Sequence, residues 1–232
     1  MSEKKYELTD ETREYDSHTL HRIRALRDFG DVKNGDLGGF IEKEENLSQD
    51  GDCWVYGDAK VYGNAKVYDD AIVCDFAEVS GEVEVYDNAK VSDFAGVYGD
   101  ARVYENAEVS DFAEVYDGAE VCGDALVYDN ARVFDEADVY GSARVYGNVK
   151  VFNDANIHGE AEVYGNAQVC DNAHVYGEAE VYGEAKIRDD VKVYGKAEVF
   201  GTSLVCGNTE ISEGKVSEVR INGSEKKSIE LD

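Results

Sequence analysis

The 232-residue chain contains no proline, so its tight turns must come from Gly, Asn and Asp, the residues that tolerate a positive φ. It also contains no apolar run long enough to span a membrane. The opening residues, MSEKKYELTD, lack the hydrophobic segment of a signal peptide. We therefore expect a cytoplasmic protein with no membrane partner.

Basic residues are scarce. The chain holds 23 Lys and Arg against 51 Asp and Glu, which gives a formal net charge of −28. Direct binding of DNA, RNA or anionic lipid is disfavoured, because phosphate groups attract Lys and Arg. A basic protein is the partner that this charge favours. Strong acidity is also typical of disordered chains, but 43% of the residues are hydrophobic and they are regularly spaced.

That spacing is a six-residue repeat. From Val55 the chain reads VYGDAK VYGNAK VYDDAI VCDFAE, and the register continues to Glu210 as 26 hexads without an insertion. Position 1 is Val in 24 hexads and Ile in two, and position 5 is Ala in 21. Position 3 is Gly, Asp or Asn in every hexad except the one that holds Glu105.

This repeat predicts a parallel β-solenoid. Side chains alternate along a strand, so positions 5 and 1 point to one side and positions 6 and 2 to the other. Positions 3 and 4 are turn formers. A single short strand cannot bury its Val, so successive coils must stack through backbone hydrogen bonds. We expect the Val and Ala side chains to be buried and the Tyr side chains at position 2 to point outward.

The coil length follows from the triplet Asp-Phe-Ala, whose phenylalanines Phe76, Phe94 and Phe112 recur in every third hexad. The residue two positions before each Phe is small, whereas most hexads hold Tyr there. We expect each Phe to fold back over this position, once per coil. Three hexads then make one coil, and 26 hexads make about nine coils. At a coil spacing of ~4.8 Å the rod is ~42 Å long.

The repeat resembles the hexapeptide-repeat, left-handed parallel β-helix superfamily, in which three hexads form one triangular coil. The resemblance covers residues 55–210. Residues 5–48, followed by the VYGNA repeats, are similar to prophage and bacterial hexapeptide-repeat proteins often labelled polymer-forming. The fold class implied is all-β: a single-stranded parallel β-helix, left-handed and triangular, with small caps at both ends.

The chain divides into three predicted regions. Residues 1–54 form a β-rich N-terminal cap, in which HTLHRIRALRDF is a strand. Residues 55–210 form the β-helix. Residues 211–232 leave the register and are predicted to form a hairpin-like C-terminal cap that turns at Asn222-Gly223. Caps cover sheet edges that would otherwise polymerise.

Two sets of outward residues are candidates for partner binding. A coil of three hexads aligns aromatic side chains in columns, and we single out the column of Tyr128, Tyr146, Tyr164, Tyr182 and Phe200. Such a ladder can stabilise stacked strands, and it can also form an interface.

The second set is acidic. Residues 55–138 carry a net charge of −16 and residues 139–210 a net charge of −5. The repeat therefore carries about one net charge per 2 Å, against one per ~1.7 Å in B-DNA. This acidity either serves solubility or mimics nucleic acid. The candidate acidic residues are Asp93, Asp111, Asp117 and Asp129.

The superfamily resemblance also implies an enzymatic alternative. Its acyltransferases generally use a histidine base near a subunit cleft, often beside loops that interrupt the coils. This chain has four histidines and uninterrupted coils, with His158 and His174 placed diagonally on one face. We expect surface histidines, free cysteines, no catalytic residue, no metal and no cofactor.

The predicted function is therefore non-enzymatic. We expect an acidic solenoid that binds a basic protein, such as a phage- or prophage-encoded inhibitor of a nucleic-acid-binding host protein, for example a CRISPR nuclease. The alternatives are a structural or self-assembling rod, which includes a homo-oligomer, and a hexapeptide-repeat acyltransferase.

Overall fold

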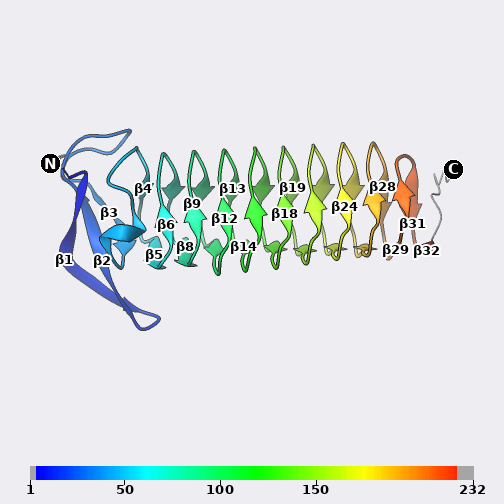
Figure 1. The fold of residues 1–232 in the computed structure, drawn as a ribbon, viewed down its shortest axis with the longest axis horizontal. Helices are drawn as coiled ribbons and strands as arrows, with labels where there is room; N and C mark the ends of the chain where they lie inside the picture. The colour runs from blue at the N-terminus through cyan, green and yellow to red at the C-terminus, as the bar shows by residue number, and fades with distance from the viewer. Residues whose placement is uncertain (1–3, 224–232) are drawn as a thin grey trace.

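The computed structural model describes residues 4–223, which form a rod of stacked coils with a hairpin at its N-terminal end (Figure 1). The hairpin consists of β1 (Tyr6–Tyr15) and β2 (His18–Ala25), which pair antiparallel. β2 then pairs antiparallel with the first strand of the rod, so the hairpin extends one face of the solenoid. β2 confirms the first eight residues of the strand predicted for HTLHRIRALRDF, and it ends at Ala25.

Three parallel sheets form the three faces of the rod. Face 1 consists of β3 (Leu37–Ile41), β5 (Lys60–Gly63), β8 (Glu78–Gly81), β11 (Gly96–Val97), β14 (Glu114–Val115), β17 (Arg132–Val133), β20 (Lys150–Val151), β23 (Gln168–Val169), β26 (Lys186–Ile187), β29 (Leu204–Gly207) and β32 (Arg220–Gly223). Face 2 consists of β4 (Trp54–Val55), β7 (Ile72–Val73), β10 (Lys90–Val91), β13 (Glu108–Val109), β16 (Leu126–Val127), β19 (Arg144–Val145), β22 (Glu162–Val163), β25 (Glu180–Val181), β28 (Glu198–Phe200) and β31 (Lys215–Ser217). Face 3 consists of β6 (Lys66–Val67), β9 (Glu84–Val85), β12 (Arg102–Val103), β15 (Glu120–Val121), β18 (Asp138–Val139), β21 (Asn156–Ile157), β24 (His174–Val175), β27 (Lys192–Val193) and β30 (Glu210–Ile211).

The hexad determines this architecture. Each strand pairs in parallel with the strand three hexads later, as Val91 does with Val109, so three hexads form one coil. The Val or Ile at position 1 and the residue at position 5 are fully buried along the rod, and they form one continuous core. The predicted β-solenoid is confirmed, with about ten turns of about 18 residues each.

Coil length varies only at the two ends. At the start of the rod, β3 pairs with β5 through a longer coil, in which Ile41 is the partner of Val61, and a bridge joins Leu47 to Val67 near the 3-10 helix η1 (Glu44–Asn46). At the other end, β31 and β32 pair in parallel with β28 and β29 through coils that are slightly shorter than three hexads. Parallel stacking thus continues beyond both limits of the hexad run.

The C-terminal region differs from the expected hairpin. β32, which contains Asn222 and Gly223, pairs in parallel with β29 and adds one more strand to face 1. Val205 and Ile221 are partners in this register, so an apolar residue still marks each coil although the hexad has ended. The second half of the predicted hairpin, residues 224–232, lies outside the described residues.

The N-terminal end of the core is covered by large side chains. Tyr6 and Trp54 are buried and contact each other edge to face, with ring centroids 6.0 Å apart. Lys5 is also fully buried, and its Nζ donates to the carbonyl oxygens of Asp50, Gly51 and Cys53 at 3.0 to 3.3 Å. These hydrogen bonds satisfy a charge that burial would otherwise penalise.

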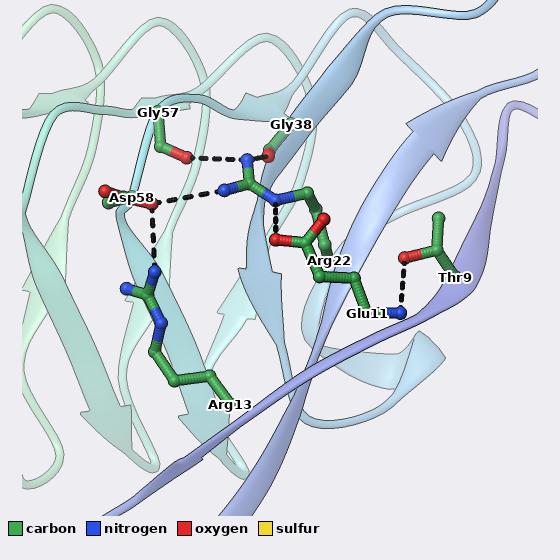
Figure 2. A network of polar contacts seen from close by, with 7 residues as sticks. All are labelled: Thr9, Glu11, Arg13, Arg22, Gly38, Gly57 and Asp58. Atoms are coloured by element: carbon green, nitrogen blue, oxygen red, sulfur yellow. Dashed lines mark hydrogen bonds and ion pairs between the residues drawn. The ribbon is translucent and has the colours of Figure 1, made fainter.

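An arginine network fixes the hairpin against the rod (Figure 2). Arg13 and Arg22 both donate to Oδ1 of Asp58, at 3.3 and 3.2 Å. Arg22 also donates to the carbonyl oxygen of Gly38 at 2.9 Å. Both guanidinium groups lie over the ring of Phe40, at 4.2 and 4.5 Å from its centroid. Carboxylate pairing and cation–π contact therefore act together at this corner.

Candidate functional site

The corners of the rod carry the acidic residues. Every residue at position 3 adopts a positive φ, from 55° at Asp69 to 94° at Gly81. Asp and Asn tolerate this left-handed conformation better than other side chains, which explains why position 3 avoids bulky residues. Eleven of these positions are acidic: Asp69, Asp75, Asp87, Asp93, Glu105, Asp111, Asp117, Asp129, Asp135, Asp171 and Asp189.

Many of these carboxylates accept a hydrogen bond from the next coil. Asp87 accepts from the backbone N–H of Glu105 at 3.2 Å, and Glu105 accepts in turn from Gly123 at 2.7 Å. Asp111 accepts from the N–H of Asp129 at 3.3 Å, and Asp129 accepts from Gly147 at 3.1 Å. The corner acids therefore have a structural role, which the sequence did not reveal.

The four candidate binding acids do not form one cluster. Asp93, Asp111 and Asp129 follow β10, β13 and β16, so they lie in one column at the corner between faces 2 and 1. Asp117 follows β14 and lies at the corner between faces 1 and 3. Asp93, Asp111 and Asp117 are exposed, and Asp129 is half-buried. As partner-binding residues all four remain predictions.

The candidate aromatic residues form one continuous ladder beside face 2. Successive rings are stacked at 4.8 to 5.1 Å in the column Tyr128, Tyr146, Tyr164, Tyr182 and Phe200. The hydroxyl of Tyr146 donates to Glu162 at 3.1 Å, and that of Tyr164 donates to Glu180 at 2.9 Å. Burial and the neighbouring Glu162 raise the pKa of Tyr146 to about 12. These contacts support the structural role of the ladder; its role in partner binding remains a prediction.

Another ladder is more exposed. Phe76, Phe94 and Phe112 stack on one another at centroid distances of 5.0 and 5.2 Å, and each is more than half exposed. Ser92 is buried near this column. The expected folding of each ring over the small residue two positions earlier stays a prediction, and more than half of each ring is left exposed. Position 4, which holds these rings, is Asp or Asn in many other hexads, which is the sequence signal that indicates exposure.

The two candidate histidines lie on face 3. His158 belongs to a ring ladder, between Tyr140 at 4.7 Å and Tyr176 at 4.9 Å, so neighbouring rings cover both of its faces. Burial lowers the pKa of His158 and of His174, and His174 adds a smaller repulsive contribution to the shift of His158. Both imidazoles are therefore more often neutral than an exposed histidine would be.

Further chemistry-bearing residues are dispersed. All five cysteines are free. Within residues 4–223 no group of three or more His, Cys, Asp or Glu side chains is placed to hold a metal ion. In the same range, no helix has the length and apolar character needed to cross a membrane.

The fold and this surface define an acidic parallel β-solenoid. No protein-family model matches the chain. A segment of it is similar to a protein of Escherichia coli K12 described as the uncharacterized acetyltransferase YdcK, with 38% identity over 61 residues. The match covers 23% of this chain and only 19% of the length of that protein. The fold and the partial match fit the hexapeptide-repeat β-helix superfamily, and the narrower resemblance to prophage proteins remains a prediction.

Proposed function

We propose that this chain is a non-enzymatic binding protein: an acidic rod that recognises a basic protein of the kind that binds nucleic acid. The observation that carries the proposal is the placement of the acids. The position-3 acids stand one coil apart within each column, and within residues 4–223 none of them forms an ion pair with a basic residue. Their charge is therefore free to act on a partner.

Position 6 provides the contrast. Several of its glutamates form ion pairs with arginine or lysine, as in the pairs Arg102–Glu120 at 2.8 Å and Arg132–Glu114 at 2.9 Å. The charge left uncompensated thus concentrates at the corners. Successive charges there are ~4.8 Å apart and repel one another, and a basic partner would relieve this repulsion.

The distribution along the rod points to its N-terminal half. Residues 55–138 carry −16, and residues 139–210 carry −5. The line charge of the whole repeat approaches that of B-DNA, which suits the nucleic-acid-binding surface of a protein. The particular partner, for example a CRISPR nuclease, is the more specific part of this proposal, and only the charge of the rod supports it.

Competition with DNA tests the proposal. Protamine, an arginine-rich protein that binds nucleic acid, is first loaded on labelled duplex DNA, and the rod is then added. We expect the rod to release the DNA at low salt and to lose this ability as salt rises, because screening acts within ~8 Å at physiological ionic strength. The triple variant Asp93→Asn, Asp111→Asn, Asp129→Asn should need several-fold more protein, since it loses three phosphate-like charges.

A matched control removes three charges from the other half of the rod. The variant Asp154→Asn, Glu160→Gln, Glu184→Gln changes exposed acids at position 4 and has the same net charge as the first variant. It should release the DNA nearly as well as the original protein. Equal losses in both variants would show that bulk charge alone is responsible, and salt-independent release would contradict the proposal.

The partial match to YdcK favours a second candidate, acyl transfer from acetyl-coenzyme A. A general base must be neutral when it accepts a proton, and burial lowers the pKa of both His158 and His174. Thiol release from acetyl-coenzyme A in the presence of amine and hydroxyl acceptors tests this candidate. Turnover that disappears in His158→Ala or His174→Ala would establish it in place of the binding function.

A further inference from the structure

The most exposed apolar feature of the rod lies at the corner between faces 2 and 1. We name this surface the Phe corner and define it by Asp75–Phe76, Asp93–Phe94 and Asp111–Phe112. The three rings are 51%, 56% and 59% exposed, and their planes lie within 7° of parallel. In residues 4–223 the other large hydrophobic side chain of comparable exposure is Leu37. Exposed apolar stripes of this kind mark interaction sites.

The backbone of this corner also accepts residues other than phenylalanine. The next three residues of the same column are Asn130, Asn148 and Asn166. The backbone bonding is the same in both halves: the N–H of Phe94 donates to the carbonyl oxygen of Asp111 at 2.8 Å, and that of Asn130 donates to the carbonyl oxygen of Gly147 at 2.9 Å. The backbone therefore accepts a polar side chain at position 4. The Asn hexads hold Tyr at position 2 and the Phe hexads hold a small residue there, but more than half of each Phe ring is still exposed to a partner.

The surroundings of the rings are strongly acidic. Each Phe directly follows an aspartate whose φ lies between 58° and 63°. The three hexads that contain the rings hold no basic residue and five acids, which are Asp75, Glu78, Asp93, Asp111 and Glu114. A second copy of this chain, with a net charge of −28, would be repelled from this surface.

We infer that the Phe corner is the docking surface for a protein segment that carries both arginine and aliphatic side chains. The inference rests on the proposed binding function and specifies its surface. The aliphatic side chains would cover the ring edges, and the guanidinium groups would pair with the column of aspartates. Charge complementarity selects the arginine, and the exposed rings select an apolar neighbour.

The chain itself shows the arginine–carboxylate part of this recognition one coil earlier. Asp58 occupies the same corner position one coil before Phe76, and it binds Arg13 and Arg22 of the hairpin at 3.3 and 3.2 Å. Both arginines also stack on the ring of Phe40. One arginine from each strand of the hairpin thus already docks on this corner through a carboxylate. The Phe corner presents the same column of corner positions to an external segment, with aspartates and exposed ring edges in place of Asp58.

Two synthetic peptides of equal length and charge test the inference, one alternating Arg with Leu and the other alternating Arg with Ser. Binding is measured by fluorescence anisotropy at low salt. The protein should bind the Arg-Leu peptide at least about tenfold more tightly than the Arg-Ser peptide, because only the former can cover the rings. The variant Phe76→Asn, Phe94→Asn, Phe112→Asn should lose this difference and still bind the Arg-Ser peptide.

Asn is the residue that the same column holds in the following coils, so the Phe variant should fold, and circular dichroism checks this. A matched control, Asn130→Ser, Asn148→Ser, Asn166→Ser, changes the same corner farther along the rod and should keep the tenfold difference. If the Phe variant keeps it too, the Phe corner is not the docking surface, although the proposed function stands. If neither peptide binds the original protein, the proposed function fails as well.

Discussion

Substitutions at Asp111 and Asp129 separate the structural role of the corner acids from their role in charge. Each residue holds a left-handed conformation, with φ of 58° and 59°, and each carboxylate accepts an N–H from the next coil. Lys at these sites would adopt this φ at a cost of about 1 kcal/mol. It would also lose the hydrogen bond that the carboxylate accepts, which contributes about 1 kcal/mol at these solvent-accessible sites. A lysine in place of Asp111 would, however, turn the repulsion by Asp93 into an attraction, so the double variant Asp111→Lys, Asp129→Lys should be about 2 kcal/mol less stable in all.

Asparagine is the informative comparison. Its side chain tolerates the left-handed region, and its Oδ1 can accept the same N–H. It also removes repulsion between carboxylates ~4.8 Å apart, which is worth about 1 kcal/mol in water. The double variant Asp111→Asn, Asp129→Asn should thus match or slightly exceed the original protein in stability. Charge neutralisation is therefore a cleaner probe of binding than charge reversal.

Urea unfolding followed by circular dichroism measures both variants. The unfolding midpoint should fall clearly for the Lys variant and should hold or rise for the Asn variant, with the same m-value for both. Equal midpoints for the two variants would refute the reasoning, because the corner carboxylates would then be stabilising neither the turn nor the next coil.

Three further predictions concern the core, alkaline pH and the histidines. Val127→Asp should disrupt the rod, because it replaces a fully buried side chain by a charge whose burial costs several kcal/mol. The control Asn130→Asp at the exposed corner should change the urea midpoint little. Similar midpoints for the two variants would contradict the assigned core. Tyr146 has a pKa of about 12 against an ordinary value of 10.0, so the stability that it contributes is complete below pH 10.0 and lost as the pH rises to about 12. Urea midpoints measured across this range should fall less for Tyr146→Phe than for the original protein, and an equal fall would count against this assignment. His158→Ala and His174→Ala should each leave peptide binding within about twofold, and a larger loss of affinity would place the histidines in the binding surface.

The sequence predicts the rod well because each hexad repeats one local solution. A buried Val, a buried Ala and a turn recur at fixed spacing, and the spacing of Phe76, Phe94 and Phe112 gives the coil. The end coils follow less closely, because the longer first coil and the shorter last coils depend on what covers the core rather than on the repeat.

The side-chain contacts between coils and between distant segments could not be predicted from the sequence. The bond from Asp87 to the N–H of Glu105 requires the carboxylate to point along the rod, which depends on the φ at the corner. The buried Lys5 beside Cys53 and the pairing of Arg13 with Asp58 join the first strand of the chain to the start of the rod. No periodicity indicates such partners, since they arise only when the hairpin folds over the end of the rod.

The uniform length of the coils within the hexad run also has a genetic consequence. Because every coil in this run presents the same edges to its neighbours, duplication or loss of the codons for one coil would lengthen or shorten the rod by one step without altering its cross-section. Each such step adds or removes one residue position in the column at each of the three corners. The length and the net charge of the rod would therefore change in steps of one coil. Related genes should differ in length by multiples of the codons for one coil.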